Sequence, residues 1–230
     1  MALDFAAQIH ALSGFNADGT DDTSTDDDFD ETAAQWMSDG AREVINLLPQ
    51  KLKEKCMTAT GVGTDSIVDL DSMGEILYVT RKNDDAGHYT ECRKIPSSHG
   101  GLATDSTNII HYATATDPVY WVDGDTSGAA TLYVKPTPTS GQPSIVHHIG
   151  YPTFTAADDG ALDIVIQSTI PNFPDEAEYL VVLYAAIKAT EYMMLTEEDP
   201  EVYAPQLTTL KQDYAQGISS LTGAPKRGGE

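Results

Sequence analysis

The sequence predicts an α+β protein, in which an α-helical bundle from the N- and C-terminal segments carries a β-rich insertion, an antiparallel sheet or a small sandwich. Three observations predict this class. Apolar residues recur at helical spacing near the N-terminus, short apolar runs separated by turn residues fill the middle, and helical spacing returns near the C-terminus. The expected segments are N-terminal helices with an acidic loop (1–60), the β-rich insertion (61–170), a C-terminal helical hairpin that completes the bundle (171–222) and a flexible tail (223–230).

The N-terminal segment begins with a short expected helix over Leu3–Leu12. The stretch from Gly14 to Asp30 then holds seven aspartates and no Lys or Arg. Such a stretch cannot bury a core and repels itself, so we expect an exposed loop. Its oxygens do not follow the spacing of an EF-hand calcium loop.

A longer amphipathic helix is expected over Glu31–Leu48, with Asp30 at its N-cap. Pro49 interrupts this helix, and three lysines follow in a further turn or two, where cations suit a helix C-terminus. With Arg42 they form a basic group, whose members are Arg42, Lys51, Lys53 and Lys55. Two roles stay open for this group: helix stabilisation with solvation, and a docking patch for an acidic partner.

The middle of the chain contains five expected strands, bounded by Gly, Pro, Asn and Asp residues. They are Ser66–Leu70, Glu75–Thr80, Val119–Val122, Thr131–Val134 and Ser144–Tyr151. Asp123-Gly124-Asp125 predicts a hairpin turn in which Gly124 supplies a positive φ. Pro136 ends the following strand because proline cannot donate to a ladder. Gly61–Asp65 is expected to be a flexible connection between helix and sheet.

The C-terminal helices have clear start signals. Asn172 and Pro174 predict a cap and a first-turn proline, followed by the acidic residues that a helix N-terminus favours. The stretch Tyr179–Ile187 has no polar face, so this helix must be covered on more than one side. A second helix carries a narrow apolar seam suited to packing on the first, and Pro205 either kinks its opening turn or marks where it begins. The seam consists of Tyr203, Leu207, Leu210, Tyr214, Ile218 and Leu221.

Composition excludes several function classes. Thirteen basic and thirty-six acidic residues give a net charge of −23, which repels phosphate backbones and anionic membranes. The two cysteines, Cys56 and Cys92, lack metal-ligand spacing, so we expect free thiols in a reducing compartment. The N-terminus does not resemble a secretion signal, and no apolar run is long enough to span a bilayer. We expect a soluble protein that is cytoplasmic where it is made.

No pattern in the sequence indicates a catalytic, cofactor or metal site. His147 and His148 are adjacent in an expected strand, so they point to opposite faces and cannot ligate one metal together. Ser97, Ser98 and His99 precede two glycines, and a loop is the better interpretation because adjacent residues rarely form a nucleophile–base pair. Basic neighbours could lower the pKa of the Cys92 thiol, but no paired base is identifiable. We therefore predict no enzyme activity and no cofactor.

Three stretches together resemble the head-to-tail adaptor proteins of tailed bacteriophages. The first is the Tyr120–Gly124 and Thr131–Pro138 hairpin, whose second strand ends in Pro-x-Pro. The second is Val146–Pro152, which closes on a Tyr-Pro pair. The third is Ile170–Ala189, followed by an acidic break and a last helix. Each motif is weak alone, and the resemblance rests on their order and spacing over residues from about 119 to 221.

The resemblance implies a structural virion protein at the head–tail junction, made in the bacterial host cytoplasm. It implies a homo-oligomeric ring of twelve copies beneath the portal protein, in contact with tail or nozzle proteins, through which genomic DNA passes without specific binding. Neighbouring subunits would then cover the apolar helix at Leu180, Leu183, Tyr184 and Ile187. The basic tail around Pro225, Lys226 and Arg227 would become ordered on docking to the portal. The negative charge either lines the DNA channel or maintains solubility.

A binding module is the alternative function. The β-rich middle would then be a carbohydrate-binding or adhesion domain of a tail or surface structure, with Tyr120 and Trp121 as candidate contacts. Because side chains alternate along a strand, only one of these two aromatic rings can face outward, so an aromatic platform is not evident.

Overall fold

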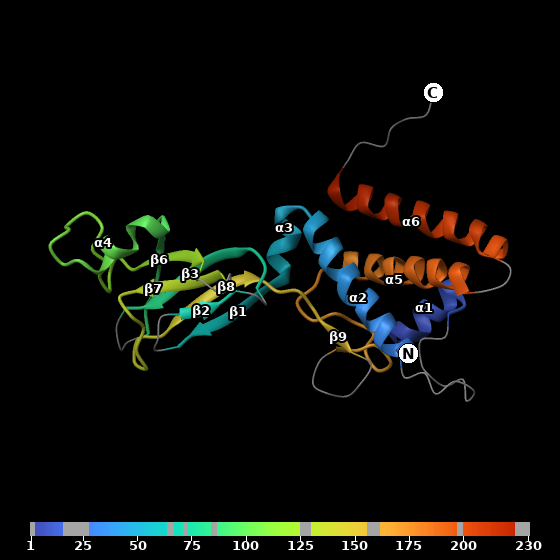
Figure 1. The fold of residues 1–230 in the computed structure, drawn as a ribbon, viewed down its shortest axis with the longest axis horizontal. Coiled ribbons are helices and arrows are strands. Elements are labelled where there is room, and N and C mark those ends of the chain that lie inside the picture. Colours follow the sequence, from blue (N-terminus) through green and yellow to red (C-terminus); the bar gives the residue numbers. More distant parts are fainter. Residues whose placement is uncertain are drawn as a thin grey trace, which may run out of the picture. The chain divides into compact units, whose positions relative to one another are not determined.

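The computed structural model describes residues 3–15, 28–63, 67–70, 73–83, 87–124, 130–155, 162–196 and 200–223. By its internal contacts the chain divides into a helical unit, Met1–Cys56 with Tyr151–Glu230, and a β unit, Met57–Gly150 (Figure 1). The fold class is α+β, as predicted, with a β-rich insertion between the two halves of a helical bundle. The insertion covers residues 57–150 by these contacts, against the expected range 61–170.

The helical unit is built around helix α5, against which α1, α2 and α6 all pack. The helices are α1 (Phe5–Ser13), α2 (Asp28–Leu47), α3 (Gln50–Lys53), α5 (Asp175–Thr196) and α6 (Ala204–Thr222), with 3₁₀ turns η1 (Glu54–Cys56) and η3 (Pro200–Val202). Packing on several sides explains why α5 has no polar face over most of its length. Its buried residues include Leu180, Val181, Val182 and Leu183 on consecutive positions.

The two N-terminal helices follow the prediction with one correction. The Asp4 carboxylate caps α1 by accepting a hydrogen bond from the Ala7 N–H at 2.7 Å, and Gly14 ends the helix with a φ of 77°. Helix α2 begins at Asp28, so Asp30 lies inside it and the predicted N-cap is wrong. Most of the aspartate-rich stretch, residues 16–27, lies outside the described residues.

The C-terminal helices also begin close to the predicted signals. Helix α5 starts at Asp175, with Asp175, Glu176 and Glu178 in its first turn as expected. Asn172 has a φ of 52° and bends the chain three residues earlier, so its predicted capping role is wrong, and Pro174 precedes the first helical residue. Helix α6 starts at Ala204, so Pro205 marks the beginning of the regular helix.

Residues 151–170 belong to the helical unit, although the sequence placed them in the β-rich insertion. The Phe154 ring meets the Phe5 ring edge-on at 5.7 Å between centroids. The Phe5 and Ala6 N–H groups donate to the carbonyls of Gln167 and Ile164, both at 3.0 Å. A short parallel pair, β9 (Phe154–Thr155) and β10 (Leu162–Asp163), therefore lies against α1 through apolar and backbone contacts that periodicity does not reveal.

The β unit contains two four-stranded sheets, ordered β1-β8-β3-β4 and β2-β7-β6-β5. The strands are β1 (Met57–Val62), β2 (Ile67–Asp69), β3 (Ile76–Lys82), β4 (Tyr89–Glu91), β5 (Arg93–Lys94), β6 (Val119–Gly124), β7 (Ala130–Lys135) and β8 (Ser144–Ile149). One cluster of buried side chains joins both sheets, including Val79 and Val146 from the first and Leu132 and Val134 from the second. The unit is thus a small sandwich whose core comes from the inner faces of both sheets.

All five predicted strands are present, and three expectations need correction. Gly61 and Val62 form part of β1, which pairs with β8, so they are not a flexible connection. Strand β6 continues to Gly124, which pairs with Ala130 and has no positive φ, so the predicted tight turn is wrong and Asp125 lies outside the described residues. Strands β5 and β6 run parallel, so the second sheet is not wholly antiparallel as expected, and residues 95–118 form the crossover connection between them.

Candidate interaction site

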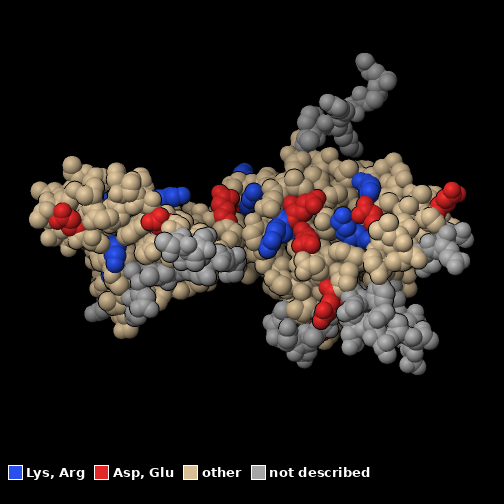
Figure 2. Space-filling model, in the orientation of Figure 1, with Lys and Arg blue, Asp and Glu red and all other residues tan. Residues whose placement is uncertain are grey.

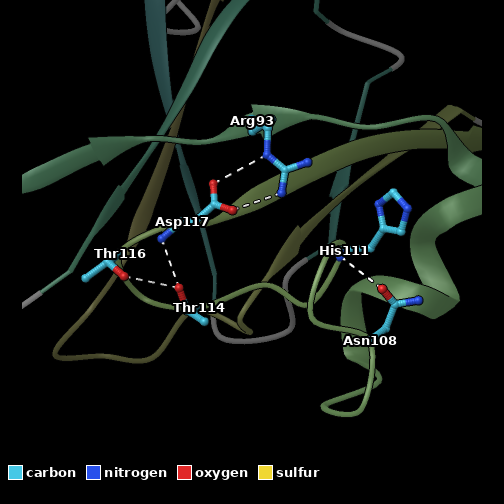
Figure 3. Close-up of polar contacts among 6 residues, drawn as sticks. All are labelled: Arg93, Asn108, His111, Thr114, Thr116 and Asp117. Carbon is cyan, nitrogen blue, oxygen red and sulfur yellow. Dashed lines mark hydrogen bonds and ion pairs between the residues drawn. The ribbon is translucent and has the colours of Figure 1, made fainter.

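The segment between α4 (Gly100–Thr104) and β6, residues 105–118, is held in one shape by its own side chains. We call it the α4–β6 loop (Figure 3). The Asp105 carboxylate accepts from the Thr107 N–H at 2.9 Å and its hydroxyl at 2.7 Å, which lowers the pKa of Asp105. The Asn108 side chain accepts from the His111 N–H at 3.1 Å. These are Asx-type turns, which fix a loop without regular secondary structure.

The far end of the loop is fixed to the sheet. The Thr114 hydroxyl accepts from the Asp117 N–H at 3.0 Å, and Arg93 of β5 binds the Asp117 carboxylate at 2.9 and 3.4 Å (Figure 3). This contact raises the pKa of the Arg93 guanidinium, chiefly through the Asp117 hydrogen bond. The pair is half exposed, so it positions the loop and adds little stability.

A second hydrophobic cluster connects the α4–β6 loop to α4 and β6. It contains Ile95, Ala103, Ala113, Val119 and Trp121, and the Ala113 N–H donates to the Ala103 carbonyl at 3.0 Å. The Trp121 ring stacks on Tyr133 at 5.4 Å between centroids, and Gly100 lies directly against it. The loop is therefore anchored at both ends and in its middle.

On this support the loop exposes large apolar side chains. Ile109 is 94% exposed, Ile110 78% and Tyr112 39%. Single exposed apolar residues are ordinary, but two adjacent isoleucines on a hydrogen-bonded loop are a candidate contact surface, because the loop backbone needs little further ordering. The sequence does not reveal this site, because an Ile-Ile pair also fits a buried strand and only the preceding Asn108 indicates a turn.

The residues predicted at a subunit interface occupy different positions. Leu180, Leu183 and Ile187 are buried within a single chain, with at most 7% exposure, because α1, α2 and α6 cover α5. Their burial needs no neighbouring subunit, so the argument from an uncovered helix is wrong. Tyr184 is half-buried between Gly40 of α2 and the Tyr214 ring of α6. Pro225, Lys226 and Arg227 lie outside the described residues.

The aromatic residues considered for carbohydrate binding are both buried. Tyr120 is 6% exposed and Trp121 7%, so neither ring faces outward, contrary to the expectation that one could. Tyr120 lies in the core between the sheets, and the segment formed by the 3₁₀ turn η2 (Ser97–His99) and α4 packs against Trp121. The described residues thus leave this pair with no sugar-stacking surface.

The residues considered as candidate catalytic or metal-binding groups have structural roles. Ser97–His99 form a 3₁₀ turn, η2, continuous with α4, and not the loop that the sequence suggested. Burial raises the pKa of the Cys92 thiol to about 12, so its basic neighbours do not activate it. His147 stacks on Tyr78, whereas the His148 ring contacts the Thr60 hydroxyl, consistent with opposite faces of β8. Within the described ranges, no three metal-binding side chains converge.

Charged side chains are mixed over the face of the molecule drawn in Figure 2. In the helical unit Lys55 pairs with Glu176 at 3.0 Å, and Glu191 pairs with both Lys188 and Lys211. Arg42 of the basic group lies over the Tyr151 ring, 5.2 Å from its centroid. Two members of this group therefore have partners within the chain, as the stabilising interpretation requires. Among the helices described, none is long and apolar enough to cross a bilayer.

A bundle with an inserted β sandwich, which exposes two adjacent isoleucines on a hydrogen-bonded loop, has the features of a protein that functions by contacting other proteins. Comparison with protein families identifies the family of this chain. The family model described as SU10 adaptor protein matches residues 12–229. The chain belongs to this family of phage head-to-tail adaptor proteins, which are structural proteins of the virion. No curated protein matches the chain.

Proposed function

We propose that this protein forms a ring of twelve copies beneath the portal, at the virion neck, and bridges the portal to the tail or nozzle proteins. The single observation that carries the proposal is the family match over residues 12–229. The protein is made in the cytoplasm of the bacterial host and acts as a structural component without catalysis.

The charge of the chain supports passage of DNA through such a ring. A net charge of −23 disfavours binding of phosphate backbones, so the genome slides past without being held. Solubility alone would also account for this charge.

The α4–β6 loop supports the bridging role. We propose that Ile109 and Ile110 insert into an apolar pocket on an adjoining structural protein of the neck. The loop is already fixed by hydrogen bonds, so docking costs little conformational entropy.

The helical unit is proposed to face the portal, with the basic tail ordering on contact. Deleting residues 223–230 removes Pro225, Lys226 and Arg227 and should weaken portal attachment. The reason is that the two positive charges of this tail, on an otherwise acidic chain, would bind an acidic crevice of the portal. Co-purification of the truncated chain with the portal measures this, and unchanged attachment would refute the role of the tail.

Cryo-EM of particles that contain this protein tests the proposed function directly. A collar of twelve copies between portal and tail is the expected result. Density on fibres or capsid decoration sites, or a ring of another order, would overturn the corresponding part of the proposal.

A further inference from the structure

Strand β1 is an unusually long open edge for this β unit. It has six residues and stands at the end of the sheet β1-β8-β3-β4 (Figure 1). The other three sheet edges of the described unit are β4 and β2, with three residues each, and β5, with two. An edge strand presents a row of unpaired N–H and C=O groups, and proteins commonly limit this hazard by keeping edges short.

Strand β1 itself carries none of the charge, proline or bulge by which edge strands are commonly protected. Its sequence, Met57–Val62, contains no charged residue and no proline, and it pairs with β8 in continuous register without a bulge. Met57, Ala59 and Gly61 are exposed, and a side chain built at Gly61 would meet no atom within 4 Å. A regular, uncharged and accessible edge is a template for strand addition.

The opposite edge of the same sheet is complementary to β1. Successive strands β1, β8, β3 and β4 alternate in direction, so β4 runs opposite to β1. A second copy placed beside β1 in the same orientation therefore presents its β4 as an antiparallel partner. Each edge also exposes a large apolar side chain, Met57 at 38% on β1 and Tyr89 at 47% on β4. Joining the edges would cover both side chains.

We propose that β1 of one copy pairs with β4 of the next, so that this sheet continues from subunit to subunit. The contact joins two different edges of identical chains and is heterologous, the type of interface that closes into a ring. It deepens the proposed function and rests on it, because it names the surface through which copies would join. Three residues of β4 make a short pairing, so we expect it to be weak between two isolated copies and to gain strength when each copy is held at both edges in a closed ring.

Hydrogen exchange compares the recombinant chain with the assembled form isolated from particles. The expected result is slower exchange of backbone amides in both 57–62 and 89–91 on assembly. Protection of β1 without β4 would indicate another occupant, such as a second β1 or a partner's strand, and would overturn the proposal. No protection of either segment in an intact ring would also overturn it. Absence of any ring would instead refute the proposed function.

A matched pair of variants provides the second test. Ala59→Lys with Gly61→Lys places two cations on the exposed edge, where lysine opposes strand addition. Ser98→Lys with Ser140→Lys makes the same charge change at exposed positions outside the sheets. We expect at least a tenfold loss of ring formation for the first variant and none for the second, with both retaining the circular dichroism of the native chain. Equal assembly of the two variants would refute the pairing.

Discussion

Two leucines on α5 differ in environment, and their substitutions should differ accordingly. Leu183 is 1% exposed, whereas Leu195 near the end of the helix is 86% exposed. Leu183→Asp puts a carboxylate into an apolar core without a partner, and we expect a loss of more than about 4 kcal/mol in the free energy of unfolding. Leu195→Asp should change it by less than about 0.5 kcal/mol. Denaturant unfolding measures both, and a stable Leu183→Asp variant would contradict the burial.

The two thiols provide a residue-scale prediction about pH. Burial raises the pKa of Cys56 to about 11 and that of Cys92 to about 12. At pH 8 the thiolate fraction is then about one in a thousand or less, so neither cysteine should react with a disulfide reagent until the chain unfolds. Folding raises both pKa values above the unfolded value, so the thiols should reduce stability only as the pH rises above about 8.5. Rapid labelling of either cysteine in the folded chain would contradict the burial of the thiols.

At the scale of an element, α4 offers two adjacent glycines with opposite surroundings. A Cβ at Gly100 would lie 2.7 Å from the buried Trp121 ring, whereas at Gly101 it would meet nothing within 4 Å. Gly100→Ala should destabilise the β unit by about 1–3 kcal/mol, since the indole cannot withdraw. Gly101→Ala should be neutral or stabilising by up to about 1 kcal/mol. Thermal unfolding followed by near-ultraviolet circular dichroism compares the two variants. Equal effects would show that the Trp121 indole moves to make room for the added methyl group.

At the scale of the whole molecule, the α4–β6 loop should matter for assembly and not for folding. Ile109→Asp with Ile110→Asp changes side chains that are 94% and 78% exposed, so the melting temperature should stay within about 2 °C of the native value. We expect at least a tenfold loss of incorporation into particles, because each carboxylate would have to be desolvated in an apolar pocket. Ile166→Asp, at an isoleucine 68% exposed in the helical unit, is the control. Normal incorporation of the double variant would remove the loop from the bridging contact.

The sequence by itself determined the fold class of this protein, its long helices and half of its described strands. Helical spacing predicted α2, α5 and α6, because the spacing of apolar residues records which side of a helix is buried. Short apolar runs bounded by turn residues predicted five of the strands. The absence of a polar face on α5 correctly indicated a helix covered on several sides. The order of these elements also supported the resemblance to the adaptor family, to which the chain belongs.

Only the tertiary structure decided what covers each face. Leu183 is buried within its own chain, on a helix that packs against α1, α2 and α6, and the apolar pattern of α5 cannot distinguish that from burial by another subunit. Ile109 and Ile110 have the composition of a strand but are exposed, because Asp105 and Asn108 fold their segment into turns. The open edge of β1 depends on pairing with β8, more than eighty residues later in the chain. Local sequence records the periodicity of burial, whereas the identity of the neighbour is set by contacts between distant segments.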